Sequence, residues 1–164
     1  MVSGKQGLRF LLIGSFVLVL GLNPLAGYLV LKRLEKKAGA PIQGKFVPSF
    51  VLPAFTLKNS SFDWQGRFRV VSGTVRVRYN PFFLIPGQKL RVQLVGEKLP
   101  VRFSGELAAS EGFSEMTVEH AVADFAIADK GPPEIYLLDI RSPEMTFRLA
   151  KEGENLSKTV KKYG

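Results

Sequence analysis

The side chains that could carry out acid–base or nucleophilic chemistry are scattered singly along the chain. The single histidine, His120, has no second histidine or glutamate at the spacing of a metal-binding or metalloprotease motif. The acids Glu106, Asp124 and Asp139 stand alone, so they offer no pair of carboxylates for general acid and base catalysis. Cysteine is absent, which removes thiol nucleophiles and thiolate metal ligands. We therefore expect a protein that is not an enzyme and that holds no cofactor and no metal.

Basic residues are the next candidates for function, because the formal net charge is +9. The first 44 residues carry six Lys or Arg and one acid, so more than half of this excess flanks an apolar N-terminal segment, where anionic lipid headgroups are the expected partner. Farther along, the arginines take the phase opposite to the apolar residues, as Arg76 and Arg78 do beside Val77 and Tyr79. A sheet that binds nucleic acid needs basic and aromatic side chains on one exposed face. We therefore expect no nucleic acid as a partner.

An uncharged segment near the N-terminus predicts a membrane anchor. Residues 1–9 form a short basic flank, and residues 10–31 follow without a charge, interrupted by Asn23 and Pro24. As a helix these 22 residues would span about 33 Å, at about 1.5 Å per residue, which is enough to cross a bilayer. A cleaved signal peptide is the alternative, but a cut after Gly27 would leave Leu25 where a small residue is favoured, and the apolar run continues. We expect a single transmembrane helix over residues 10–31.

The helical period continues beyond this segment. Apolar residues recur on one side at Leu31, Leu34 and Ala38, and Gly39 and Pro41 supply stop signals. We expect an amphipathic juxtamembrane helix over residues 32–41. Four basic side chains are predicted to lie at the membrane interface, with a solvated helix end as the alternative: Lys32, Arg33, Lys36 and Lys37.

The β part of the chain begins at Ile42, where the spacing of apolar residues changes from helical to alternating. Short alternating runs separated by turns are typical of consecutive antiparallel strands with one apolar face. We expect about seven or eight such strands in meander order over residues 42–150, then a polar, basic tail over residues 151–164 that frays. The expected fold class is mainly β: an N-terminal transmembrane helix and a curved antiparallel meander sheet. An open groove and a small sandwich or barrel fit the pattern equally.

The apolar phase of these strands is the candidate surface for lipid or for a partner protein. It is one-sided, because Arg, Gln or Thr occupies the alternate positions in residues 74–79 and 90–94. Residues 82–85 add four consecutive apolar side chains on a loop, which either tuck under an open end of the sheet or form an apolar lip. The candidate lipid- or partner-facing residues are Phe68, Val70, Val75, Val77, Tyr79, Phe82, Phe83, Leu90, Val92, Leu94, Val101 and Phe103.

Four short stretches follow one another in a recognisable order. An apolar segment runs into L-x-x-L-E-K-K-A-G-A-P-I at residues 31–42, and F-T-L-K-N follows at residues 55–59. G-R-F at residues 66–68 then leads to S-G-T-V-R-V-R-Y-N-P at residues 72–81. In this order, over residues 25–107, the chain resembles the N-terminal module of the AsmA-like proteins of bacterial envelopes.

The resemblance implies one inner-membrane helix, a periplasmic curved sheet with an apolar groove, and a role in phospholipid transport or outer-membrane homeostasis. Members of this family usually carry several hundred more residues of groove, whereas eight strands at about 4.8 Å spacing give a sheet about 40 Å wide. The positive-inside rule counts two bases before the anchor and four after it, which favours a cytoplasmic C-terminal domain. We follow the resemblance and expect a periplasmic one.

Two functions are therefore expected. The first is a single-pass inner-membrane protein that binds the acyl chains of membrane phospholipids on its apolar sheet face, for lipid transport or envelope homeostasis. The second is a structural or accessory subunit that docks other envelope proteins, or copies of itself, through the same face.

Overall fold

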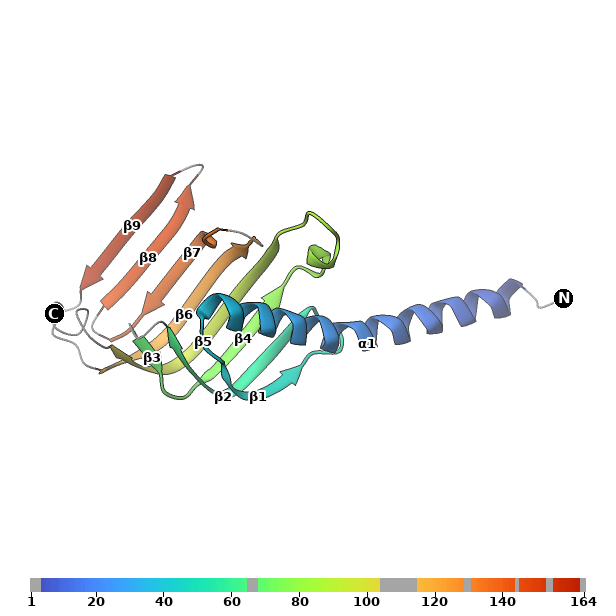
Figure 1. Ribbon diagram of the computed structural model, residues 1–164, viewed down its shortest axis with the longest axis horizontal. Coiled ribbons are helices and arrows are strands. Elements are labelled where there is room, and N and C mark those ends of the chain that lie inside the picture. Colours follow the sequence, from blue (N-terminus) through green and yellow to red (C-terminus); the bar gives the residue numbers. More distant parts are fainter. Residues whose placement is uncertain are drawn as a thin grey trace.

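The structure is a computed structural model that describes residues 4–64, 68–103, 115–128, 131–143, 145–152 and 155–162. One N-terminal helix leads into an antiparallel sheet, so the chain is mainly β, as predicted (Figure 1). The helix α1 (Gly4–Ala38) continues through Pro24 and ends where Gly39 takes a φ of +73°, a left-handed conformation that glycine adopts without strain. Within the described residues, no helix combines the length and apolarity needed to cross a membrane.

Nine strands of the described chain form one sheet. In chain order they are β1 (Gln43–Pro48), β2 (Ala54–Trp64), β3 (Phe68–Val70), β4 (Thr74–Tyr79), β5 (Leu90–Phe103), β6 (Glu115–Ile127), β7 (Glu134–Arg141), β8 (Met145–Glu152) and β9 (Asn155–Lys162). A short 3-10 helix, η1 (Pro81–Leu84), lies between β4 and β5.

Neighbouring strands pair antiparallel in a meander. The order across the sheet is β1-β2-β3-β5-β6-β7-β8-β9, and β4 also pairs with β2 and β5. Among the described strands, β1 and β9 each have a neighbour on one side, so the sheet has two open edges (Figure 1). Of the architectures compatible with the sequence, this order corresponds to the open sheet.

At Asn59 on β2 and Lys98 on β5, the alternation of buried and exposed side chains shifts by one residue. We call the line through these two residues the crease. Asn59 of β2 has a φ of 51° and Lys98 of β5 has a φ of 52°, so both adopt left-handed backbone. On β5 the buried side chains occupy even-numbered positions before Lys98 and odd-numbered positions after it, and β2 changes phase at Asn59. The buried residues concerned are Phe55, Leu57 and Ser60 on β2 and Leu90, Val92, Leu99 and Val101 on β5.

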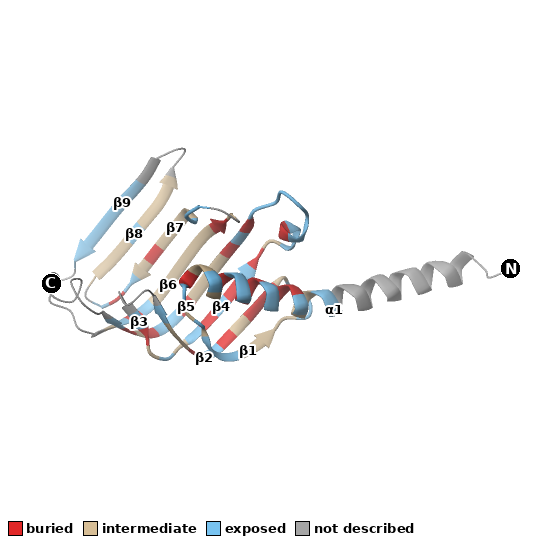
Figure 2. Cartoon of the chain, in the orientation of Figure 1, coloured by how far each residue is buried: buried red, intermediate tan, exposed pale blue. Residues whose placement is uncertain are grey.

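The hydrophobic core lies between α1 and the part of the sheet nearest to it. Val30 of α1 is fully buried, as are Leu90 and Val92 of β5. Leu31, Leu34 and Ala38 are buried too, which confirms that they form the apolar side of the helix. Figure 2 shows the buried residues on α1 and on the strands beneath it, whereas β8 is coloured intermediate and β9 exposed. The segment predicted to be juxtamembrane is therefore packed on the sheet.

Three predicted elements need correction. The helices expected over residues 10–31 and 32–41 are one continuous helix, α1. Short strands separated by turns were expected, but the alternating run at residues 90–94 continues through residues 96–98 as one strand, β5, because the left-handed residue Lys98 changes the phase of the strand without ending it. The tail expected to fray carries β9, which pairs with β8 along its whole length. Its exposed lysines match the charges that edge strands commonly carry. Residues 104–107 of one expected strand lie outside the described residues.

Candidate functional site

Most of the predicted apolar lining is buried in one hydrophobic core that also includes α1. The residues concerned are at most 8% exposed and share a core with Val30 and Leu34 of the helix: Val70, Val75, Val77, Tyr79, Leu90, Val92 and Val101. Leu94 is partly buried against the same core, and the side chains of Phe68 and Phe103 lie outside the described part of the chain. The lining that was expected to be open is therefore largely buried, in a core to which the apolar side of α1 contributes.

Two close contacts hold α1 on the sheet. A Cβ atom added to Gly27 would lie 3.3 Å from Cδ1 of Phe55 and 3.4 Å from Cζ of Phe46, so glycine lets the helix approach these rings. The Tyr79 hydroxyl donates a hydrogen bond to the Asn23 carbonyl at 2.9 Å. Burial raises the pKa of Tyr79, which keeps this donor protonated. The helix is thus fixed at two neighbouring turns.

The apolar run at residues 82–85 is divided by η1. Phe83 is buried, with its ring centre 6.0 Å from that of Tyr79 in an edge-on arrangement. From α1, the Arg33 guanidinium lies over the Phe83 ring, 5.4 Å from the ring centre. Three residues of the run are exposed by 52–63%: Phe82, Leu84 and Ile85. Both expectations therefore apply, since Phe83 tucks beneath the sheet end and its neighbours form a lip.

An apolar surface that was not singled out from the sequence lies on β7, β8 and β9. Leu138 directly opposes Leu149, Ile140 opposes Phe147, and Phe147 opposes Val160. Directly opposed residues of antiparallel strands share a face, and Ile140 packs against the core, so this is the face that carries α1. We call these five residues the apolar shelf. Each is partly exposed, Val160 by 43%, and in Figure 1 β8 and β9 extend beyond α1.

The opposite face of the sheet is the more polar one, although Val95 and Val122 oppose each other on it. Arg91 of β5 donates two hydrogen bonds to the Asp124 carboxylate of β6, at 2.9 and 2.8 Å. Arg141 pairs in the same way with Asp139 on β7, at 3.2 and 2.9 Å, and this contact lowers the pKa of Asp139. Asp124 and Asp139 are therefore partners of arginine, and Glu106 lies outside the described residues.

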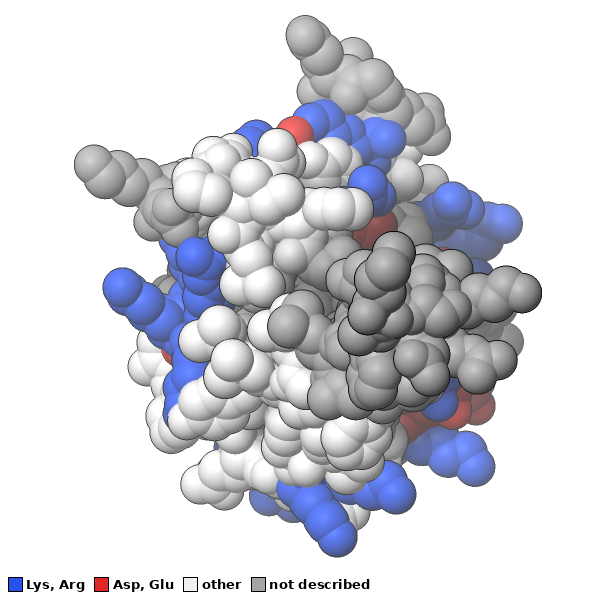
Figure 3. Space-filling model, turned by 90° about the vertical axis from the view of Figure 1, so that its right-hand side faces the viewer, with Lys and Arg blue, Asp and Glu red and all other residues white. Residues whose placement is uncertain are grey.

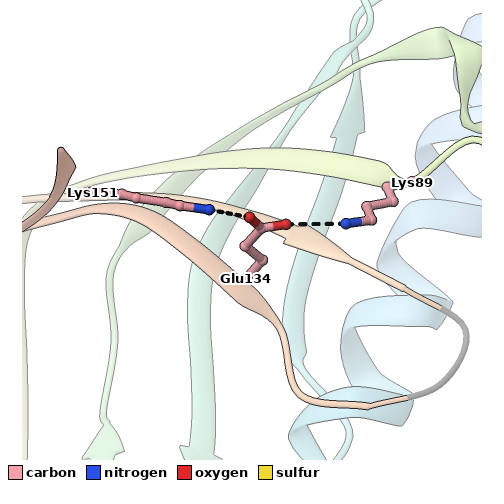
Figure 4. Close-up of polar contacts among 3 residues, drawn as sticks. All are labelled: Lys89, Glu134 and Lys151. Atoms are coloured by element: carbon pink, nitrogen blue, oxygen red, sulfur yellow. Dashed lines mark hydrogen bonds and ion pairs between the residues drawn. The ribbon is translucent and has the colours of Figure 1, made fainter. Parts of the chain in front are cut away.

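Glu134, the first residue of β7, lies between two lysines (Figure 4). Its carboxylate accepts hydrogen bonds from Nζ of Lys151 on β8 and from Nζ of Lys89, at 3.1 Å for Lys89. These bonds, with the one from Lys151 first, lower the pKa of Glu134 from 4.5 to about 2. Such a carboxylate is a weak base near neutral pH, so the cluster joins strands and is poorly suited to proton transfer.

The histidine and the acids of the described chain do not assemble into a metal site. His120 lies on β6, opposite Glu97 of β5 and Arg141 of β7. Among the described residues, no group of three or more histidine or carboxylate side chains is arranged to hold a metal ion.

The four predicted interface bases lie on the last turns of α1 and separate into two sets. Lys37 donates a hydrogen bond to the Gly131 carbonyl at 3.2 Å, in the connection between β6 and β7. The other three line one surface pocket: Lys32, Arg33 and Lys36.

Comparison with protein-family models, curated proteins and solved structures finds no match to this chain. The resemblance to AsmA-like proteins therefore stays a prediction. The geometry itself offers a sheet with one polar face and one apolar face, and α1 covers part of the apolar face. Such a surface is suited to holding apolar ligands or a protein partner.

Proposed function

We propose that the chain is a membrane-anchored protein of the cell envelope that binds lipid acyl chains on the apolar shelf, in the service of lipid transport or envelope homeostasis. In this proposal the apolar N-terminal part of α1 enters the inner membrane, the sheet is periplasmic, and the site lies on β7–β9. The observation that carries it is the shelf: directly opposed apolar pairs continue the core face beyond the helix that covers it.

The shelf offers a short apolar path to an acyl chain. Its residues lie two positions apart on β7 and on β8, so it extends over roughly 7 Å along these strands at about 3.4 Å per residue. This is about half of the ~15 Å depth of one leaflet, so the shelf would hold part of an acyl chain. Each methylene group moved from water onto an apolar surface contributes up to about 0.8 kcal/mol. A chain lying along the shelf would therefore be retained by contact area, without any polar recognition.

A substitution pair on neighbouring residues of β8 tests this proposal. Leu149 belongs to the apolar shelf, whereas Arg148 lies opposite Asp139 on the polar face. We expect Leu149→Glu in the full chain to weaken binding of a phospholipid with a fluorescent acyl chain at least about tenfold, because a carboxylate against hydrocarbon costs more than 1.4 kcal/mol. Arg148→Glu introduces the same charge on the other face and should leave binding unchanged. Equal effects of the two variants would refute binding at the shelf.

An accessory subunit is the second candidate, and the open edge at β9 favours it. Among the described strands β9 pairs with β8 alone, so it forms an edge of the sheet beside Val160. A partner that added a strand there would extend the sheet and cover the shelf with its own side chains. Photocrosslinking from Val160 distinguishes the candidates, because one dominant protein adduct supports the subunit and phospholipid adducts support lipid binding.

A further inference from the structure

Two loops expose apolar side chains at the end of the sheet from which the N-terminal half of α1 extends (Figure 1). The loop between β1 and β2 carries Phe50, Val51 and Leu52, with Val51 75% exposed. The loop at η1 carries Phe82, Leu84 and Ile85, with Phe82 63% exposed. We call these six residues the collar. Large apolar residues exposed side by side on a water-soluble surface are uncommon and usually mark a site that binds a membrane or another protein.

Both loops are held against α1. The Asn23 side-chain amide donates a hydrogen bond to the Phe50 carbonyl at 3.0 Å, which fixes the first loop beside the helix. Phe83 anchors the second loop, since it is buried and lies under the Arg33 guanidinium. On the helix between these contacts, Leu25 and Leu29 are 56% and 42% exposed. The apolar surface of the collar is therefore continuous with that of the helix.

Basic side chains border this surface. A shallow pocket of about 350 Å³ between α1 and η1 is lined by Leu29, Phe83 and Leu84 together with Lys32, Arg33 and Lys36. Lys32 also forms an ion pair with Glu35 at 2.7 Å, so the three bases carry more charge than this one acid offsets. Figure 3 views this end of the molecule and shows an uncharged central area with Lys and Arg around its rim and few acids. An apolar area with a basic rim is complementary to hydrocarbon beneath anionic headgroups.

We propose that the collar is a second membrane contact: its two loops dip into the surface of a bilayer around α1, with an anionic phospholipid headgroup in the pocket of Lys32, Arg33 and Lys36. A bilayer is favoured over a protein partner because the loops surround the helix whose preceding residues 10–22 are uncharged, and because the rim is basic. The contact would hold the sheet at a fixed angle to the membrane. It shares with the proposed function the premise that α1 enters a bilayer, and it does not depend on lipid at the shelf.

Site-specific fluorescence tests this inference on the full chain. The protein has no cysteine, so Val51→Cys, Leu84→Cys and the control Lys161→Cys on β9 each accept one environment-sensitive dye. After reconstitution into vesicles of phosphatidylcholine and phosphatidylglycerol, the dyes at positions 51 and 84 should be quenched by nitroxide-labelled acyl chains. The dye at position 161 should be quenched by iodide in the water. Iodide quenching at all three positions, without nitroxide quenching at 51 and 84, would overturn the collar as a membrane contact.

A second arm tests the headgroup. Nitroxide quenching at position 84 should weaken at least about threefold in vesicles of phosphatidylcholine alone, because about 1 kcal/mol per base near an anionic surface is lost. It should also weaken, to a smaller extent, in the Lys32→Gln, Lys36→Gln double variant, which keeps Arg33. The matched control Lys161→Gln, Lys162→Gln should leave it unchanged. Quenching that is the same without anionic lipid and in the double variant would refute an anionic headgroup in the pocket. If the dyes on the collar are quenched by nitroxide but no lipid binds at the shelf, the collar is supported and the proposed function is refuted. If lipid binds at the shelf but the dyes on the collar are not quenched by nitroxide, the proposed function is supported and the collar is refuted.

Discussion

The hydroxyl of Tyr79 donates a hydrogen bond to the main-chain carbonyl of Asn23 at 2.9 Å, joining the end of β4 to α1 across 56 residues of sequence. Asn23 immediately precedes Pro24, whose ring removes one backbone donor from the helix. Tyr79 is 5% exposed, so its hydroxyl has little access to water and depends on this partner. The bond fixes the turn of α1 at which the helix leaves the sheet.

Removal of this bond should destabilise the packing of α1. We expect Tyr79→Phe to lower the free energy of unfolding by about 0.5–1.5 kcal/mol, the usual contribution of one such hydrogen bond. Denaturant unfolding of the full chain in detergent micelles measures it. Tyr28→Phe is the control, because Tyr28 is 48% exposed on α1, and it should change stability little. Equal effects of the two variants would contradict the role given to Tyr79.

A larger residue at Gly27 should push α1 away from the sheet. The rings of Phe55 and Phe46 leave no room for more than a tight Cβ atom, so we expect Gly27→Leu to cost about 1–3 kcal/mol, as overpacked cores do. Gly21→Leu is the matched control, since a Cβ atom there has no neighbour within 4 Å among the described residues. Hydrogen exchange should report faster exchange of residues 26–38 in Gly27→Leu alone. Unchanged exchange in that variant would show that the helix does not need this close approach.

Leu99 packs against Gly96 and Gly73, so a larger residue at either glycine should destabilise the fold. A Cβ atom at Gly96 would lie 2.4 Å from Cδ1 of Leu99, and one at Gly73 would lie 2.2 Å from Cδ2. Because Leu99 is 7% exposed and cannot move freely, we expect Gly96→Ala to cost about 1–3 kcal/mol. In a Leu99→Ala background the same change should cost less, which a double-mutant cycle measures. Additive effects would contradict a direct clash.

The contribution of Glu134 to stability should depend on acid pH. Its pKa is lowered from 4.5 to about 2, so its contacts with Lys151 and Lys89 stabilise the fold above pH 4.5. This stability should be lost as the pH falls from 4.5 toward 2, because the folded state must then take up a proton at a weakly basic site.

The difference in unfolding free energy between the wild-type chain and Glu134→Gln should therefore shrink across this window and vanish below it. Glu97→Gln on β5 serves as the control for general acid effects. Carbon NMR of the side-chain carboxyl gives a direct reading, with a midpoint near pH 2 expected. A midpoint near pH 4.5 would show that the lysines do not hold this carboxylate.

Local patterns were sufficient to predict the strand order and several boundaries. The alternation of β4 appears in the structure as exposed Arg76 and Arg78 between buried Val75, Val77 and Tyr79. The strand ends before Asn80 and Pro81, because proline lacks the donor needed to continue the ladder. Gly39 ends α1 for the reason that the sequence suggested. These features depend on residues close together in the chain.

The features that escaped prediction depend on distant contacts. The apolar side of α1 with Leu31 and Leu34 suits a lipid surface and a sheet equally, so periodicity could not show that it packs into the core of the sheet. Lys98 has no propensity for left-handed backbone, and its conformation accompanies the phase change that β5 shares with β2 at the crease. The apolar shelf was missed because β9 is mostly polar, with Leu156 and Val160 as its large apolar residues, and the pairing of Val160 with Phe147 is visible in the register alone.

The most direct test of lipid binding compares two neighbouring positions on β8. A photoreactive phenylalanine analogue at position 147 would lie on the apolar shelf, and the same group at position 148 would lie on the polar face opposite Asp139. After irradiation of the full chain in its native membrane, mass spectrometry identifies the adducts. We expect phospholipid adducts through their acyl chains at position 147 and far fewer at position 148. Equal lipid yields at the two positions, or no lipid adduct at position 147, would contradict acyl-chain binding on the apolar shelf.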